Sequence, residues 1–590
     1  MSDPATTRTT SDPVLATVVS NRLQAIAEHM AEAMLLTSRS PIFQIRDMVT
    51  GIFTADGRWV ATKDWIPVLA GSMQSAWDAV AEAYTSFEDG DVILLNDPYH
   101  GNNHPPDMTI LKPVFHAGQL VFWTVSKGHH LDVGGGGVMG VNPYAVDCWD
   151  DALRIPPVRL YRGGEYDDEI WRMILLNLRL PDFVNGDLHC QVGAVNVGAE
   201  DLRAMLEKFG TEPVMAAVDD LLAASERQMR SEIGKLRDGV YRSERFLDHG
   251  SAVHPDPVRV QLEVRVDGEA IVFDFTGTDG QVPGIGNSPM PNTVASCCVG
   301  LFGVVDPELR MNGGTMAPIE IVAEPGCAVN AKPPAGTSLS TMPMAETIVD
   351  AIWLALAEAV PNGSNAGWAS ACFFGQEGVW KHTGRPFVAS GAFAFGGSGA
   401  TLGADGWDGL GSLVAMGGSQ TQDAELVEVK SPLQVLGFGL RTDSAGPGRW
   451  RGGSGGWTRY RVEQDGLRCL RWGGGSTEKT KPYGLMGGHS ADPHKGMVTR
   501  SEGSRETITE NTIIELNEGD VVSTEEAGGG GYGDPAEREP EAVLADVRSG
   551  LVSTAAAESV YRVALAAGGK AIDEERTARL RGAGANGASR

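Results

Sequence analysis

Residues 96–108 read NDPYHGNNHPPDM, and residues 126–135 read SKGHHLDVGG. Between these two polar loops lie residues 109–115 (TILKPVF) and residues 120–126 (LVFWTVS), which are rich in β-branched and aromatic side chains. Such runs are typical of strands, and HAGQ at 116–119 has the composition of a turn. We therefore predict a β-hairpin at whose open end the two polar loops meet.

The two loops hold the densest group of metal-type ligands in the chain, since five of the twelve histidines lie between residues 100 and 130. The candidate ligands are Asp97, His100, His104, Asp107, His129, His130 and Asp132. A mixture of imidazole and carboxylate suits divalent cations and leaves positions open for water or substrate. Asp and Asn also cap turns, so Asp97 fits a ligand or a cap, and Asn103 is interpreted as a turn residue. Two facing loops that both carry His and Asp favour a metal site.

The composition is that of a globular protein, with 42% hydrophobic and 21% charged residues among 590, enough for three or four domains. A formal net charge of −28 argues against nucleic-acid binding, because the chain repels phosphate. The seven cysteines form no CxxC pair and indicate reduced thiols. Neither a secretory signal nor an apolar run of 18 residues is present, so we predict a cytoplasmic protein without membrane contact.

Residue periodicity predicts an α+β fold with several domains, in which helices mix with largely antiparallel sheets. Helices are expected over residues 14–36, 73–84, 169–178, 202–236 (interrupted near Gly210), 292–305 and 346–360. Strands are expected on both sides of Asp56-Gly57, over 91–95, and over 258–266 and 270–275 around Asp267-Gly268. From Gly363 glycine becomes frequent, which indicates short strands and tight turns, and helix returns near Glu537 with Asp546 and Ser553 as helix caps.

These composition changes suggest a division of the chain into segments. The predicted segments are a disordered stretch (1–12), an α+β domain with the metal-type loops (13–250), an α+β middle domain (251–362), a glycine-rich β-dominated domain (363–535), and C-terminal helices with a loose tail (536–590).

Several long elements resemble those of the hydantoinase B/5-oxoprolinase family, which also includes the alpha-type subunits of acetone and acetophenone carboxylases. The resemblance runs from about residue 13 to residue 566 and includes NDPYHGNNHPPD (96–107), GHHLDVGG (128–135), LRIPPVRLY (153–161) and LRTDSAGPGRWRGGSGG (440–456). The chain departs from the family pattern in IPVLAGSM (66–73), where Leu69 stands in a position that is often histidine.

The resemblance implies a metal site and roles for particular residues. His104, Asp107 and His129 occupy the positions of the family's metal ligands, and Asp47 is placed near another metal-side aspartate. His130 or Asp132 is then expected to orient a ligand or to move a proton in catalysis. Because adjacent side chains of an extended segment point to opposite faces, only one of His129 and His130 can face the site directly.

The resemblance also implies a partner subunit and a reaction. Family members work with a larger ATP-binding A-type subunit, which fits the absence of a GxxxxGK[ST] motif here. The expected complex is a hetero-oligomer in which ATP with Mg on the partner phosphorylates a small lactam or imide. Water activated by a Zn, Mn or Fe ion on this chain then opens the ring. The alternatives are the matching subunit of an ATP-dependent ketone carboxylase and a non-catalytic scaffold subunit.

Overall fold

The computed structural model describes residues 12–585, except residues 39, 138, 361–362, 391–394, 419 and 567–568. The segment predicted to be disordered, residues 1–12, lies outside the described residues apart from Asp12. The side chain of Asp12 accepts a hydrogen bond from the backbone of Val14 and so caps the first helix. The described chain is an α+β protein with mainly antiparallel sheets, as the sequence predicts.

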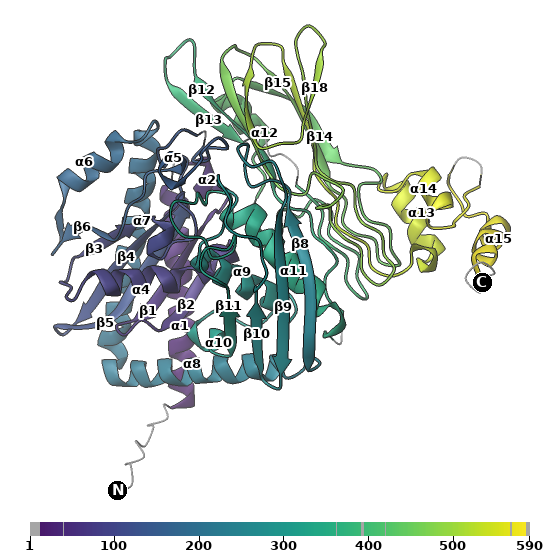
Figure 1. Cartoon of the computed structure of the whole chain (residues 1–590). Coiled ribbons are helices and arrows are strands. Elements are labelled where there is room, and N and C mark those ends of the chain that lie inside the picture. Colours follow the sequence, from purple (N-terminus) through teal and green to yellow (C-terminus); the bar gives the residue numbers. More distant parts are fainter. Residues whose placement is uncertain are drawn as a thin grey trace.

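A seven-stranded antiparallel sheet forms the centre of the N-terminal half (Figure 1). Its strands, in order of pairing, are β2 (Trp59–Asp64), β1 (Met48–Thr54), β5 (Gln119–His129), β4 (Asp107–His116), β3 (Val92–Leu95), β6 (Val158–Arg162) and β7 (Glu165–Tyr166). Strands β4 and β5 form the predicted hairpin. The consecutive residues Ile52 and Phe53 belong to two different apolar clusters, so both faces of the sheet are covered.

Helices cover this sheet on each side. One side carries α1 (Pro13–Thr37), α7 (Pro181–Phe209) and the first part of α8 (Thr211–Ile233), and the other carries α3 (Pro67–Gly71) and α4 (Met73–Ala83). The connections contain α2 (Pro41–Gln44), η1 (Pro98–His100), α5 (Cys148–Asp151) and α6 (Asp168–Leu176). The predicted break lies at Gly210, whose φ of +80° separates α7 from α8. Helix α7 begins at Pro181, well before the predicted start at Leu202.

A second sheet follows in the middle of the chain. Its strands pair in the order β11 (Ile319–Val322), β10 (Ala270–Asp274), β9 (Val258–Asp267) and β8 (Gly239–Leu247), and β10 and β11 are parallel. The helical segments here are α9 (Met290–Phe302), α10 (Gly313–Met316), η2 (Ser340–Met344), α11 (Ala345–Ala355) and η3 (Leu356–Glu358). One apolar cluster includes Phe53, Leu262 and Ile352, so this region and the N-terminal sheet share a core. The division into domains stays a prediction.

Two antiparallel sheets make up the glycine-rich region. One pairs β13 (Pro386–Ser390), β12 (Cys372–Val379), β16 (Leu467–Gly473) and β19 (Thr512–Leu516); the other pairs β14 (Leu433–Leu440), β15 (Gly456–Val462), β20 (Val521–Glu525), β17 (Lys495–Thr499) and β18 (Arg505–Ile508). Below them, extended loops stack closely (Figure 1). A Cβ atom at Gly529 would lie 1.8 Å from the carbonyl oxygen of Ser398. Glycine is required there because neighbouring backbones touch.

The short helices of the C-terminal half are η4 (Leu413–Ala415), α12 (Ala424–Lys430), η5 (Pro535–Glu537), α13 (Pro540–Arg548), α14 (Thr554–Ser559) and α15 (Glu574–Ala585). Ser553 caps α14, as predicted. The prediction for Asp546 is wrong, because this residue lies inside α13 and pairs with Arg538. None of the described helices has the length and apolar character needed to cross a lipid bilayer.

Candidate metal centre

The β4–β5 hairpin brings the two polar loops together. Its register places Asp107, the first residue of β4, directly opposite His129, the last residue of β5. The loop before β4 then returns His104 to the same place. The meeting of the loops at the open end of the hairpin is thus a consequence of the strand pairing, as the sequence predicts.

Three of the predicted ligands meet at this point. Nε2 of His104 lies 2.8 Å from Oδ1 of Asp107, and Nδ1 of His129 lies 3.1 Å from the same oxygen. One ligand atom from each of the three side chains lies within 4.8 Å of the other two. The side chains of His104 and Asp107 are buried, and that of His129 is 14% exposed. The cluster is therefore compact and open on the side of His129.

The hydrogen bonds of His104 fit a metal ligand. Its Nδ1 lies 3.1 Å from the carbonyl oxygen of Ser338, which can only accept, so Nδ1 carries the hydrogen. In the neutral ring, Nε2 then presents a lone pair to Oδ1 of Asp107. Nε2 and Oδ1 are then both acceptors only 2.8 Å apart, and such a pair is stable only with a positive charge between or beside them. Either a second proton on the imidazole or a bound cation can supply this charge. The donor set therefore suits a divalent ion.

Asp107 and His129 each stabilise the charged form of the other. Burial raises the pKa of Asp107, but His104 and His129 outweigh it and keep that pKa well below its usual range. Burial lowers the pKa of His129, but the hydrogen bond with Asp107 and the charge of Asp47 outweigh it, so the pKa of His129 is raised. The cluster thus stabilises a carboxylate beside positive charge.

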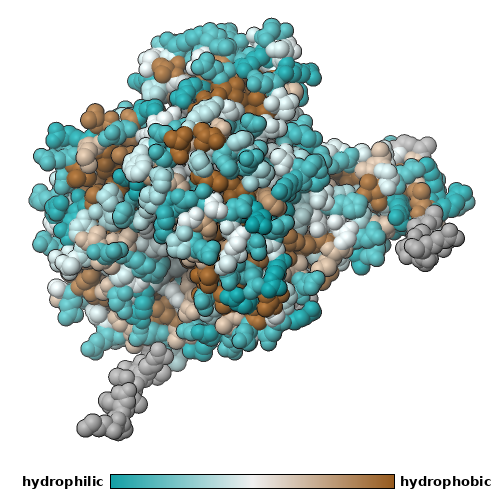
Figure 2. Space-filling model, viewed as in Figure 1, coloured by the Kyte–Doolittle hydropathy of each residue, from teal (hydrophilic) through white to brown (hydrophobic). Residues whose placement is uncertain are grey.

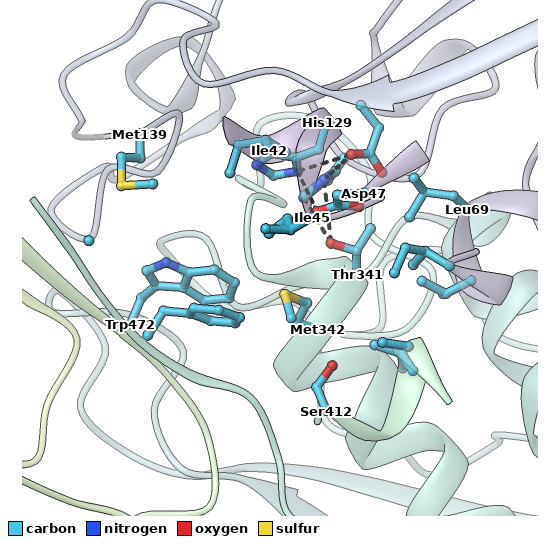
Figure 3. Close-up of a pocket in the computed structure, with 18 of the residues that line it drawn as sticks. Ile42, Ile45, Asp47, Leu69, His129, Met139, Thr341, Met342, Ser412 and Trp472 are labelled. Carbon is cyan, nitrogen blue, oxygen red and sulfur yellow. Dashed lines mark hydrogen bonds and ion pairs between the residues drawn. The ribbon is translucent and has the colours of Figure 1, made fainter. Parts of the chain in front are cut away.

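Asp47 lies at the edge of the cluster, between α2 and β1. Its backbone oxygen accepts a hydrogen bond from the backbone of His129, and one of its carboxylate oxygens lies 4.0 Å from Nδ1 of His129. Burial raises the pKa of Asp47 to about 6. Asp47 lines the same pocket as His104, Asp107 and His129, so the sequence prediction placed it in the right neighbourhood, although its oxygens are farther from the common point (Figure 3).

The side chains of His130 and Asp132 point away from the pocket and into the protein. Nε2 of His130 donates to Oε1 of Gln191 at 2.9 Å, and burial lowers the pKa of His130 to about 4. Asp132 accepts hydrogen bonds from the backbone of Gly134 at 2.9 Å and of Leu180 at 2.7 Å, at the start of α7. Neither residue is part of the described pocket lining.

The remaining candidates in the first loop form a separate turn. Asp97 accepts a hydrogen bond from the backbone of Tyr99 and pairs with Arg154 at 2.8 Å and with His100 at 2.6 Å. The structure therefore places Asp97 as a turn cap within an ion pair, and it places His100 at the surface with 56% of its side chain exposed.

The sequence did not reveal a chain of buried polar groups behind the cluster. Nδ2 of Asn103 donates to Oδ2 of Asp107 at 2.6 Å, and Oδ1 of Asn103 accepts from Nζ of Lys127 at 3.2 Å. Lys127 also donates to the hydroxyl of Ser72 at 2.6 Å. Asn103 is thus more than a turn residue, because it holds the carboxylate of Asp107 from behind.

The cluster faces a pocket that is walled by distant parts of the chain (Figure 3). Leu69 comes from α3, Met342 from η2 and Trp472 from β16. Thr341, from η2, places its hydroxyl 3.0 Å from Nδ1 of His104. A buried group of His and Asp side chains at one end of an apolar pocket can bind a cation and a small molecule side by side.

Comparison with known proteins places this site in a family. The model of the hydantoinase B/oxoprolinase family matches residues 12–535, and the chain belongs to this family. It is 32% identical over 579 residues to the beta subunit of the caprolactamase of Pseudomonas jessenii, covering 96% of this chain and 98% of that protein. It is 30% identical to the B-type subunit of a putative D-/L-hydantoinase of Pseudomonas sp. (strain NS671), covering 97% of this chain and 98% of that protein.

Solved structures agree with this assignment. The crystal structure of the ATP-dependent caprolactamase from Pseudomonas jessenii matches with a TM-score of 0.90 at 30% identity, covering 97% of this chain and 99% of that one. The nucleotide-free acetone carboxylase also matches with a TM-score of 0.90, covering 98% of this chain and 83% of that one. At 20% identity, this second likeness shows the fold alone. The family resemblance found in the sequence is confirmed.

Proposed function

We propose that this chain is the metal-binding B-type subunit of an ATP-dependent cyclic-amide hydrolase. The observation that carries the proposal is the meeting of His104, Asp107 and His129 within 4.8 Å at the end of an apolar pocket. We assign these three side chains, together with Asp47, to a divalent cation such as Zn, Mn or Fe. Two relatives of nearly the same length are named as subunits of a caprolactamase and a hydantoinase, and both names refer to cyclic amides.

The chemistry explains why two subunits are needed. An unstrained amide is a poor electrophile, and phosphorylation of its carbonyl oxygen converts it into an activated imidate. We assign this step to an ATP- and Mg-binding A-type partner in a hetero-oligomer, because this chain has no GxxxxGK[ST] motif. A divalent cation in the cluster of this chain supplies Lewis-acid chemistry and lowers the pKa of water.

The residues of this chain prepare the site. The apolar walls exclude bulk water, which strengthens electrostatic interactions inside the pocket. The carbonyl of Ser338 holds His104 in the tautomer whose Nε2 faces Asp107. We assign positioning roles to His130 and Asp132, because Gln191 and the start of α7 fix them outside the pocket, on either side of Leu131. Of the two roles expected from the sequence, orientation is the one that these contacts favour.

Replacement of His104 tests the proposal. We expect His104→Ala in the reconstituted complex to lose both bound metal and ATP-dependent ring opening, because the cluster then keeps too few ligands. His100→Ala is the matched control, since this nearby histidine is exposed and lies outside the pocket. Elemental analysis and product assays are the measurements. Stoichiometric metal in His104→Ala would refute the ligand assignment, and full turnover without metal would refute the hydrolase mechanism.

The same complex separates the alternative functions. A hydrolase couples ATP consumption to ring opening in the absence of bicarbonate, whereas a ketone carboxylase requires bicarbonate for ATP turnover. We favour the hydrolase, because the chain is 32% identical to the caprolactamase relative and only 20% identical to the acetone carboxylase chain. A scaffold subunit would bind metal at this site and yet tolerate His104→Ala without loss of activity in the complex.

A further inference from the structure

Apart from the ligand cluster, most of the pocket lining is apolar. It includes Ile45, Ile66, Leu69, Met342, Val414 and Trp472. The ring of Trp472 stacks on that of Phe373, with centroids 5.1 Å apart, so this part of the wall is braced between β16 and β12. Leu69 comes from α3, is 2% exposed, and lies across the pocket from Trp472 in Figure 3. A bound molecule therefore meets hydrocarbon and aromatic surfaces away from the cluster.

The described lining of the pocket contains no Lys or Arg that could pair with an anionic ligand, and its two histidines face Asp107. Among the described lining residues the carboxylates are Asp47 and Asp107. The nearby ammonium of Lys127 lies behind Asn103 and is engaged by Asn103 and Ser72. The nearby guanidinium of Arg46 lies over the ring of Trp65, 5.2 Å from its centroid. Neither cation lines the pocket.

The charge balance of the site follows from these residues. The carboxylates of Asp47 and Asp107 already match the charge of one divalent cation. A carboxylate on the substrate would add a third negative charge in a mainly apolar pocket, where an unpaired charge is costly to bury. The uncharged polar side chains of the described lining are Thr341, which contacts His104, and Ser412, Gln420 and Gln422. These side chains can form hydrogen bonds with one amide group, but they cannot neutralise the charge of a carboxylate.

We propose, on the basis of the hydrolase function above, that the substrate is an uncharged lactam whose ring is mainly hydrocarbon. The amide faces the cluster, and the methylene groups of the ring face Leu69, Met342 and Trp472. Rings that carry a carboxylate, as 5-oxoproline does, or a second amide, as hydantoin does, are poor substrates. Leu69 is a specificity-determining residue because it provides part of the wall against which the methylene groups pack.

A panel of lactams tests this proposal in the complex reconstituted with its A-type partner. The decisive pair is 2-pyrrolidinone and 5-oxoproline, which share a five-membered ring and differ only in the carboxylate. We expect kcat/KM to be about 100-fold higher for 2-pyrrolidinone, because its ring buries no unpaired charge. We also expect a rise from 2-pyrrolidinone to the seven-membered ε-caprolactam, since each added methylene packs against the apolar wall. Equal or better use of 5-oxoproline or hydantoin would overturn the proposal.

Binding measurements separate this proposal from the proposed function. The affinity of the metal-loaded chain for the same lactams, measured by isothermal titration calorimetry, does not depend on turnover. If no cyclic amide is hydrolysed but 2-pyrrolidinone still binds more tightly than 5-oxoproline, the hydrolase function fails and the preference of the pocket stands. If 5-oxoproline binds at least as tightly, the pocket assignment fails whatever the complex hydrolyses.

Substitution of Leu69 tests whether this residue forms part of the apolar surface that selects the substrate. Leu69→His places a polar ring in the pocket, and we expect it to lower the ratio of kcat/KM for ε-caprolactam to that for hydantoin by about 10-fold or more. Leu69→Met is the matched variant, because it conserves volume and apolar character and should keep the native ratio. An unchanged ratio in Leu69→His would remove Leu69 from the specificity wall. If that variant does not fold, the panel on the native chain decides.

Discussion

Both carboxylate oxygens of Asp107 are engaged, but by different kinds of partner. Oδ1 faces the imidazoles of His104 and His129, whereas Oδ2 accepts a hydrogen bond from Asn103. Asn103 is itself held by the ammonium of Lys127, which is fully buried. Groups behind a metal ligand fix its orientation and commonly change metal affinity when they are removed. Loss of the Asn103 side chain is therefore expected to weaken metal binding, although this side chain does not face the position proposed for the cation.

Replacement of Asn103 tests this chain of contacts. We expect Asn103→Ala to weaken metal binding by about 10- to 100-fold, because Asp107 loses the donor that fixes Oδ2 and Lys127 loses an acceptor. The measurement is metal affinity by competition with a chelator of known strength. Asn312→Ala is the control, since Asn312 is also buried but caps α10, outside the site. An affinity of Asn103→Ala equal to that of Asn312→Ala would contradict the role.

The side chains proposed as metal ligands could be found from the sequence, because their residue types are concentrated in two loops joined by a clearly predicted hairpin. The family resemblance then selected His104, Asp107 and His129, and these are the side chains that the structure brings together. Ser338 and Thr341 could not be found in this way. They reach His104 from more than two hundred residues downstream, and their types are common in loops. Contacts over such separations are set by tertiary packing, which local patterns do not record.

Some of the helices and strands that position the site were predicted from the sequence, and others were missed. Helix α1 and the β4–β5 hairpin have clear periodicity and turn signals, and both were found. The part of α7 before Leu202 was missed, because residues 185–194 read NGDLHCQVGA and contain two glycines and few strong helix formers. Packing explains the helix. Leu188, Val192 and Val195 are buried in the cluster that covers the N-terminal sheet, so tertiary contacts outweigh local propensity.

Asp187 lies in this missed segment and connects α7 to the corner between α1 and α2. It is 1% exposed, and its Oδ1 accepts a hydrogen bond from the hydroxyl of Ser38 at 3.3 Å. Burial raises the pKa of Asp187 from its ordinary value of 3.8 to about 7, despite opposing hydrogen bonds from Ser38 and Ser40. Between pH 3.8 and about pH 7, Asp187 therefore keeps a proton in the folded chain that it releases in the unfolded chain. The contribution of Asp187 to the free energy of unfolding therefore falls as pH rises from about 4 to 7.

We predict that Asp187→Asn stabilises the protein at pH 8 and does so less at pH 5.5. The neutral amide avoids the burial of charge, and the 1.5 pH units between 5.5 and 7 correspond to about 2 kcal/mol at most. The midpoint of thermal unfolding, followed by circular dichroism at both pH values, is the measurement. Asp182→Asn is the control, because Asp182 is exposed in the first turn of the same helix. A stability gain that does not increase with pH would show that Asp187 is not the buried acid assumed here.

The composition of the chain predicted its general architecture, whereas the division into domains stays a prediction. The mixed helices and antiparallel sheets are as expected, and the view in Figure 2 shows a largely hydrophilic surface with scattered apolar patches, which fits the net charge of −28. The apolar cluster that joins the N-terminal sheet to the middle of the chain was not foreseeable. Its members come from segments as distant as Val49 and Ala527, and composition does not reveal which of them meet.

The C-terminal helices project from the rest of the protein (Figure 1). They have a small apolar cluster of their own, made of Val543, Val552, Ala557, Tyr561 and Val563. Arg538 connects them to the glycine-rich loops. Its guanidinium bonds to Asp405 at 2.7 Å and to Asp546 at 2.9 Å, and the residue is 4% exposed. Since the apolar cluster is small and lies within the projecting segment, the attachment is expected to depend on this ion-pair network, whose guanidinium is buried.

We predict that Arg538→Ala loosens the attachment of the C-terminal helices without disturbing the metal centre. Removal of the guanidinium deprives Asp405 and Asp546 of their shortest ion pairs and leaves both with contacts to Arg451, at a cost of about 1–3 kcal/mol, because Asp405 is partly exposed. Limited proteolysis followed by mass spectrometry should then show faster cleavage near residue 538, while the metal content stays unchanged. Arg579→Ala is the control, because Arg579 forms only an exposed pair with Glu575, and pairs of that kind contribute little. Cleavage of Arg538→Ala at the rate of the control would mean that packing, rather than this ion pair, holds the projecting helices in place.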